Sequence, residues 1–339
     1  MINNNLAKYL LCLLGLICVM LFAISFGSVS IDIDKIIIHL LNQFPGISLN
    51  SNLTDTEISI LNQIRLPRVF LAGLVGAALS LSGATYQGAF KNDLADPYLL
   101  GVASGAGLGA TISIVFGVHS LANSVPATTF FSFIGALLAV VMVVSFARFA
   151  GKDSSNLLLA GVAVAAFLTA IQTYMLQANR DSIVQVYIWI LGGLSTSGWD
   201  EVLLIAPYVL ICGVPLIMLG KYLDVLRVGD TEAKSLGINP TKIRLTVVLF
   251  ATLLTAAAVS VSGLISFVGL IVPHTVRIVF GSSYKSLLIY SVIIGSAFLI
   301  LADVGSRILV SSQLPIGVVT AGIGAPFFIF ILATRNNHA

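Results

Sequence analysis

Apolar residues recur along the chain in long runs that are separated by short polar segments. A membrane-spanning helix needs about 20 apolar residues, because it rises about 1.5 Å per residue through a hydrocarbon layer about 30 Å thick. The runs predict about ten transmembrane helices, the eighth and ninth of them short. The predicted spans are 6–26, 69–89, 98–118, 130–149, 157–176, 202–219, 243–263, 264–280, 287–301 and 316–332.

The apolar run from 243 to 280 is too long for one span. As a single helix it would be about 57 Å long, nearly twice the thickness of the hydrocarbon layer. Ser260, Ser262 and Gly263 predict a turn inside this run, and Pro273 is predicted to interrupt the helix that follows.

The first apolar run has features of a secretory signal, which is the alternative to a retained helix. It is longer than the usual signal core of about 7–15 residues, and Ala23-Ile24-Ser25 is a poor cleavage site. We interpret it as a retained first span.

Lysine and arginine predict the orientation, because they are enriched in cytoplasmic loops. With the N-terminus inside, twelve of the seventeen positive charges are cytoplasmic. Both termini are then cytoplasmic, and the chain is a single transmembrane domain over 1–339. Its external segments are 27–64 and 177–201, and its main cytoplasmic segment is 222–242.

Composition supports lipid as the solvent of this protein. Hydrophobic residues make up 58% of the chain and charged residues 9%, whereas an average soluble domain is about 25% charged. The mean hydropathy is +1.03. A net charge of +3 without a run of lysines or arginines gives no reason to expect a nucleic-acid partner.

Cysteines and histidines do not form a metal-binding pattern. Cys12, Cys18 and Cys212 lie in apolar runs and are interpreted as small packing residues. The four histidines are scattered. We therefore predict no metal site and no cofactor in this chain.

Small residues recur at the spacing that lets helices pack closely. Gly101, Gly105 and Gly109 are four residues apart, and Gly76 with Ser80 repeats this spacing in the second predicted span. Lipid gives helices no hydrophobic drive to associate, so such rows predict a tightly packed bundle.

The middle of the predicted spans is almost free of ionisable residues, which argues against an ion-coupled carrier. No cluster of polar groups suggests a membrane enzyme. The sequence also lacks the G-x-x-x-x-G-K-[ST] phosphate loop. We predict that the chain is not an enzyme and that any ATP, with its Mg²⁺, is hydrolysed on separate subunits.

The cytoplasmic segment contains a short predicted helix over 232–236. Asp230 or Thr231 is expected to cap it and Gly237 to end it. Such a helix, held between two spans, either contacts a partner subunit or forms part of an ordinary solvated loop.

Two arginines precede the second span. Arg65 and Arg68 lie three residues apart, on one helical face, with Pro67 at the helix start. They are either interfacial anchors or a docking point for carboxylates of an external partner, together with Arg307.

Several co-linear motifs resemble the permease subunits of type II ABC importers for iron-siderophores, haem and vitamin B12, over nearly the whole chain. They are RLPR at 65–68, GAALSLSG at 76–83, NDLADPYLLGV at 92–102, LAGV at 159–162, GLISFVGLIVPH at 263–274 and LPIGVVT at 314–320, with Gln87 and Arg277.

The resemblance implies ten helices per subunit, a second copy of the permease, two cytoplasmic ATPases and an external binding protein, in a prokaryotic cell membrane. It assigns binding-protein docking to Arg65, Arg68 and Arg307, and an inner gate to Asn92, Leu94, Ser154 and Ser155. Contact with the ATPase is assigned to Gly229, Asp230, Thr231, Glu232, Ala233, Leu236 and Gly237.

One departure concerns the gate, because Asp93 stands where the family usually has proline. The implied cargo is an iron chelate, a siderophore or haem, which the Asp96-Pro97-Tyr98 variant favours. Vitamin B12 and an oxyanion such as molybdate are the alternatives.

Overall fold

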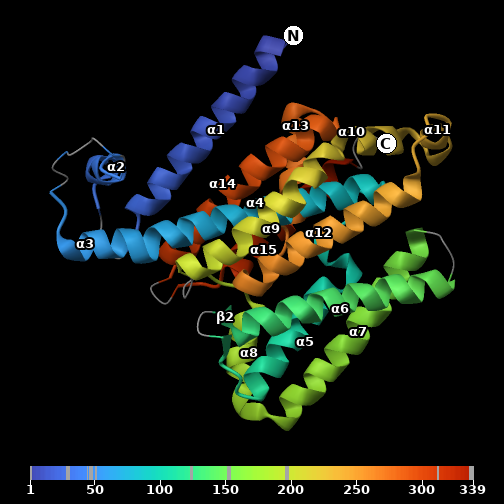
Figure 1. Cartoon of the computed structure of the whole chain (residues 1–339), viewed down its shortest axis with the longest axis horizontal. Coiled ribbons are helices and arrows are strands. Elements are labelled where there is room, and N and C mark those ends of the chain that lie inside the picture. Colours follow the sequence, from blue (N-terminus) through green and yellow to red (C-terminus); the bar gives the residue numbers. More distant parts are fainter. Residues whose placement is uncertain are drawn as a thin grey trace.

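The computed structural model describes residues 2–27, 31–43, 45, 49, 52–122, 125–150, 154–194, 198–310 and 313–335. Most of these residues are helical (Figure 1). The elements are α1 Ile2–Ser25, α2 Ile33–Leu41, α3 Asp55–Ile60, η1 Leu61–Arg65, α4 Leu66–Phe90, η2 Pro97–Leu100, α5 Val102–Val115, β1 Ser120–Ala122, β2 Val125–Pro126, α6 Ala127–Ala150, α7 Ser154–Ala178, η3 Arg180–Ser182, α8 Ile183–Ile190, α9 Trp199–Met218, α10 Gly220–Val228, α11 Asp230–Ser235, α12 Pro240–Ser262, α13 Val268–Phe280, α14 Tyr284–Ile308 and α15 Ile316–Arg335. The strands β1 and β2 form one short antiparallel ribbon.

Each of the ten predicted spans corresponds to one described helix. Seven are long and apolar enough to cross a membrane, and three apolar helices are shorter, namely α5, α13 and most of α15. The prediction of a polytopic all-α membrane protein is therefore confirmed. The prediction of a short ninth span was wrong, because α14 has 25 residues.

The long apolar run breaks as predicted. Helix α12 ends at Ser262, and Gly263 adopts φ of +67°, a left-handed conformation that glycine adopts without steric cost. The interruption expected at Pro273 does not occur, because Pro273 lies within the continuous helix α13. The third span is shorter than predicted, since Tyr98–Leu100 belongs to the 3₁₀ helix η2 and Gly101 (φ +77°) separates it from α5.

Helix α4 lies at the centre of the bundle, and α9, α12, α13 and α14 pack around it (Figure 1). A β-carbon on Gly76 would collide with the backbone of Gly295 on α14, and one on Gly83 would collide with Gly269 on α13. The predicted close packing at Gly76, Gly105 and Gly109 is confirmed by such backbone contacts. Gly101 instead precedes α5 as its N-cap.

Helix α4 begins before the membrane. Helices α3, η1 and α4 form one continuous run of 36 residues, and Leu61–Arg65 is a π-helical turn within it. Figure 1 shows α3 at one end of the bundle and α11 at the other. We call the α11 end the inner end, which the charge pattern predicts to face the cytoplasm, and the α3 end the outer end.

Candidate functional site

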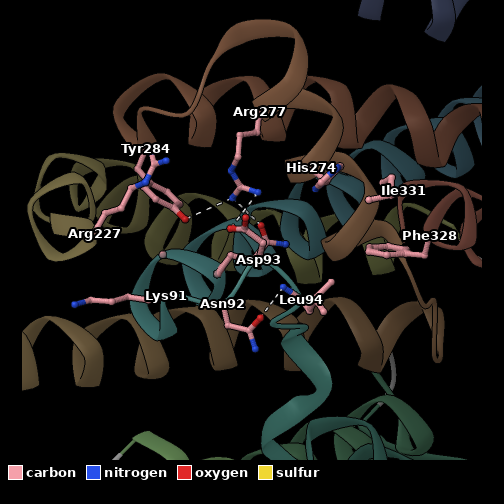
Figure 2. A pocket seen from close by; sticks show the side chains of 12 residues that line it. Lys91, Asn92, Asp93, Leu94, Arg227, His274, Arg277, Tyr284, Phe328 and Ile331 are labelled. Carbon is pink, nitrogen blue, oxygen red and sulfur yellow. Dashed lines mark hydrogen bonds and ion pairs between the residues drawn. The ribbon is translucent and has the colours of Figure 1, made fainter. Parts of the chain in front are cut away.

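A cavity of about 660 Å³ opens at the inner end of the bundle, beside the loop that joins α4 to η2 (Figure 2). Its lining residues come from the end of α4, the following loop, α10, α13, α14 and α15. They are Gln87, Gly88, Lys91, Asn92, Asp93, Leu94, Arg227, His274, Arg277, Tyr284, Phe328 and Ile331. The predicted gate residues Asn92 and Leu94 thus line one cavity.

The loop after α4 is shaped by local hydrogen bonds. Helix α4 ends with Lys91 in the left-handed conformation (φ 52°), and the Asn92 amide donates to the Gln87 carbonyl at 3.1 Å. The Asn92 side-chain oxygen accepts from the Leu94 amide at 3.0 Å, which is a turn that asparagine favours. This turn leaves the Leu94 side chain 57% exposed at the cavity.

Asp93, the departure from the family pattern, pairs with an arginine across the cavity. Its carboxylate lies 3.3 Å from Arg277 Nη1 (Figure 2). Arg277 also donates from Nη2 to Gln87 Oε1 at 3.0 Å and reaches the Tyr284 hydroxyl at 3.5 Å. Asp93 therefore ties the loop to α13. Sequence reasoning noted the acidic group but not its partner.

The other two predicted gate residues open helix α7. Ser154 and Ser155 are its first residues, but their side chains lie outside the described part of the chain. Whether the side chains of Ser154 and Ser155 reach the cavity therefore stays a prediction.

The coupling segment forms two short helices, α10 and α11. The N-cap of α11 is Gly229, so the prediction that Asp230 or Thr231 caps this helix was wrong. Gly237 (φ +76°) follows its end as predicted. The Gly237 amide donates to Lys234 and the Ile238 amide to Ala233, at 2.9 Å each, which together form a Schellman motif.

Asp230 uses its side chain for a longer-range contact instead of a cap. Its Oδ1 lies 2.8 Å from Lys91 Nζ and 2.7 Å from Arg244 Nη2. The hydrogen bond from Arg244, and next the one from Lys91, lower the pKa of Asp230 to about 2. The carboxylate therefore stays charged near neutral pH.

Helix α10 is held by a different carboxylate. Asp224 accepts hydrogen bonds from the Ser283 hydroxyl at 2.8 Å and the Tyr284 amide at 2.7 Å, at the first turn of α14. Arg227 donates to the Ser282 carbonyl at 3.1 Å. The carboxylate satisfies an otherwise unpaired helix N-terminus and interacts favourably with its dipole.

Other coupling residues differ in exposure. Ala233 is buried, whereas Leu236 is 68% exposed and Thr231 and Glu232 are exposed. The apolar Val228, at the end of α10, is 76% exposed. Two large apolar side chains therefore stand on the surface beside α11.

The predicted docking arginines gather at the outer end, as the sequence suggested, but they are not surface groups in this chain. Arg65 and Arg68 are 4% and 8% exposed. Arg68 pairs with the buried Asp303, with Nη2 at 2.8 Å from Oδ1, and Arg307 Nη2 lies 3.1 Å from the other carboxylate oxygen. We call Arg65, Arg68, Arg307 and Asp303 the outer arginine cluster.

Two members of this cluster cap helix α1. Arg65 Nη1 donates to the Ile24 carbonyl at 2.8 Å, and Arg307 Nη1 donates to the Phe26 carbonyl at 2.9 Å. The last carbonyls of a helix have no partner within it, and cations are favourable there. Sequence reasoning missed this role, because the only local signal was the pair of arginines itself.

No group of three or more His, Cys, Asp or Glu side chains among the described residues has the arrangement of a metal site.

The helices and their charged contacts define a multi-pass membrane protein with a built-in inner segment of two short helices. The model of the FecCD transport family matches residues 14–334, and the chain belongs to this family. The family consists of permease subunits of ABC importers, which work with partner subunits that carry the ATPase.

Named relatives differ in their cargo. The chain is 36% identical, over 94% of its length and 96% of the relative, to the "Probable iron chelatin transport system permease protein" of Helicobacter pylori. It is 38% identical, over 86% of its length and 78% of the relative, to the cobalamin import system permease protein BtuC of Halobacterium salinarum.

The fold also matches a solved structure. A chain of a metal-chelate type ABC transporter in an inward-facing conformation superposes with a TM-score of 0.84 at 28% identity, covering 97% of this chain and 99% of that one. The identification as an ABC importer permease is therefore confirmed.

Proposed function

We propose that this chain forms the path by which an iron chelate crosses the cell membrane of a prokaryote, driven by ATP hydrolysed on two cytoplasmic subunits. Two copies of the chain surround the path, and an external binding protein delivers the cargo. The observation that carries the proposal is the attachment of α10 and α11 to the inner ends of α4, α12 and α14 through Asp224 and Asp230. A segment fixed in this way can pass a partner's movement to the bundle.

The surface of the coupling segment supports contact with the ATPase. Val228 and Leu236 expose large apolar side chains next to the mostly polar helix α11. Replacing Leu236 with Asp is expected to reduce co-purification of the ATPase at least fivefold, because a charge would be desolvated at the contact. Unchanged co-purification would place the contact elsewhere.

The outer arginine cluster supports docking through its charge. Three arginines and one aspartate give it a positive field, although Arg65 and Arg68 are buried. We propose that carboxylates of the binding protein approach this field. The affinity should then fall steeply as salt rises from about 0.05 M to about 0.5 M, since salt screens charges. An affinity that is independent of salt would contradict docking by charge.

Reconstitution tests the whole proposal. Proteoliposomes that contain the permease, its ATPase and binding-protein partners, and ATP are expected to take up iron-siderophore. Parallel assays with haem, cobalamin and molybdate identify the cargo. Uptake of cobalamin alone would show that the cargo is cobalamin and not an iron chelate. Uptake driven by an ion gradient without the ATPase would overturn the proposal as a whole.

A further inference from the structure

One carboxylate oxygen joins three helices at the inner end. Asp230 Oδ1, on α11, lies 2.8 Å from Lys91 Nζ at the end of α4 and 2.7 Å from Arg244 Nη2 on α12. Arg244 in turn donates from Nε to the Ala89 carbonyl in the last turn of α4, at 3.0 Å. We call Asp230, Lys91 and Arg244 the Asp230 link. It fixes α11 to the end of α4 through both a side chain and the backbone.

Lys91 stands directly before the cavity wall. Its left-handed conformation (φ 52°) turns the chain out of α4, so the next residues, Asn92 to Leu94, line the cavity (Figure 2). Within this segment Asp93 reaches Arg277 on α13. A displacement of Lys91 therefore moves the residues that line the cavity without any intervening flexible segment.

The neighbouring helix α10 is anchored elsewhere. Asp224 and Arg227 form hydrogen bonds to the α13–α14 turn and the first turn of α14. Arg227 lines the same cavity as the segment after α4, but among the described residues neither side chain forms a hydrogen bond or ion pair with residues 91–94. Helix α10 also packs against α4, with Leu223 beside Gly88, but this contact is apolar. Of these two helices, only α11 is joined by an ion pair between described residues to the segment 91–94, which Arg277 on α13 also contacts through Asp93.

We propose that Asp230 is the positioning residue that transmits movement of α11 to the segment 91–94 at the cavity. This inference rests on the proposed function, because it presumes that a partner moves α11. The side chains of Lys91 and Asp230 are 34% and 40% exposed, so water can assist in breaking and remaking the pair during a transport cycle. The second cation, Arg244, keeps Asp230 oriented while the pair with Lys91 changes.

The first test uses the complete transporter in proteoliposomes. Asp230→Asn keeps the side chain's shape and removes its charge, and is expected to lower the cargo moved per ATP hydrolysed at least fivefold. Asp230→Glu should restore most of the ratio. The control Lys242→Gln removes an exposed charge at the start of α12, outside the link, and should leave the ratio unchanged. A normal ratio in Asp230→Asn overturns the proposal.

A double-mutant cycle assigns the effect to the pair. If Asp230 acts through Lys91, Lys91→Met should lower the ratio as much as Asp230→Asn, and the double variant should be no worse than either. Losses that multiply in the double variant would show that the two residues act separately, which overturns the link.

The second test needs no partner subunit. Amide hydrogen exchange of the purified wild-type permease in lipid nanodiscs is compared with that of Asp230→Asn. Exchange over 92–95 should rise several-fold in the variant, while the first turn of α14 stays unchanged. Unaltered exchange at 92–95 overturns the link even if the complete transporter works. If exchange at 92–95 increases in Asp230→Asn but the complete wild-type transporter shows no ATP-driven uptake, the proposed function is wrong. The contact between Asp230 and the segment after α4 is then still supported.

Discussion

The outer arginine cluster and the Asp230 link both join helices that are distant in sequence, but they differ in their exposure to water. Asp303 is fully buried and its two arginine partners have side chains about one-tenth exposed, whereas the three side chains of the Asp230 link are 21–40% exposed. Breaking a buried pair leaves a charge without solvent, while an exposed pair exchanges its partner for water. The outer end is therefore fixed by its charges, and the inner end can change its contacts at low cost.

The same contrast appears in what each network holds. The outer arginine cluster caps the carbonyl end of α1. It also joins α4 to α14 through Arg68 and Asp303, in the part of the bundle where these helices pack closely. The inner contacts hold a loop and two short helices against the bundle. This arrangement is consistent with the proposed movement of the inner segment against the buried contacts of the outer end.

The largest expected effect comes from removing the buried carboxylate. Asp303→Asn should lower the free energy of unfolding by about 3–5 kcal/mol, because Arg68 and Arg307 then remain buried without their counter-charge. Unfolding in mixed micelles with increasing dodecyl sulfate measures this change. Asp181→Asn, an exposed carboxylate, is the control. A loss below about 1 kcal/mol would mean that water reaches the outer cluster, and the contrast between the two ends would disappear.

A smaller loss is expected when a helix cap is removed. Arg65→Gln should destabilise the protein by about 1–3 kcal/mol, because the Ile24 and Ser25 carbonyls at the end of α1 lose a charged donor. The change should be localised, so a protease site placed after α1 should be cut faster in the variant. Equal cutting in both proteins would show that the cap does not hold α1.

The ion pair between Asp93 and Arg277 should contribute little to the free energy of unfolding but should limit the access of water-soluble reagents to the loop after α4. Asp93→Asn is expected to change the free energy of unfolding by less than about 1 kcal/mol, since the Asp93 side chain is 62% exposed. A cysteine placed at Leu94 should nevertheless react faster with a water-soluble maleimide in this variant, because the loop loses its tie to α13. Asp93→Glu serves as the control. A large loss of stability with unchanged labelling would reverse the assignment of the two ends.

The smallest effect expected is that of pH on the Asp230 link. Arg244 and then Lys91 lower the pKa of Asp230 to about 2, below its value of about 3.9 in an unfolded chain. A lowered carboxylate pKa gives stability that is complete above about pH 4 and is lost as pH falls towards about 2. The cargo moved per ATP should therefore show no pH dependence from titration of Asp230 between about pH 5.5 and 8, and wild type and Asp230→Glu should have parallel pH profiles. A step in that range found only in wild type would show that the carboxylate is not held by its cations.

The membrane helices could be predicted from the sequence because lipid imposes one requirement on every span. A long apolar run has to satisfy its backbone internally, so its length alone indicates a helix, and Gly263 marked where the run from 243 to 280 had to break. Helix α14 was predicted too short because polar residues flank its apolar centre. Asp224 satisfies its first turn and Arg68 pairs with Asp303 near its end, so the helix continues through both polar stretches.

Two central charged contacts could not be predicted, since each joins residues far apart in sequence. Lys91 and Asp230 are separated by 139 positions, and Arg68 and Asp303 by 235. A local pattern suggested that Asp230 caps α11, and the same carboxylate was instead taken by cations from α4 and α12. Asn92 and Leu94 were predicted from motif resemblance and do line a common cavity, but whether they gate transport stays a prediction.

The capping of α1 has a consequence for the biosynthesis of the protein. Helix α1 leaves the ribosome first, yet one of the arginines that cover its carbonyl end, Arg307, follows Phe26 by 281 residues. During translation the end of this helix therefore stays partly uncovered in the bilayer until the chain has been inserted as far as Arg307. Nascent chains that stop before Arg307 should hold their first helix loosely, which gives quality-control proteases a feature by which to distinguish unfinished copies from complete ones.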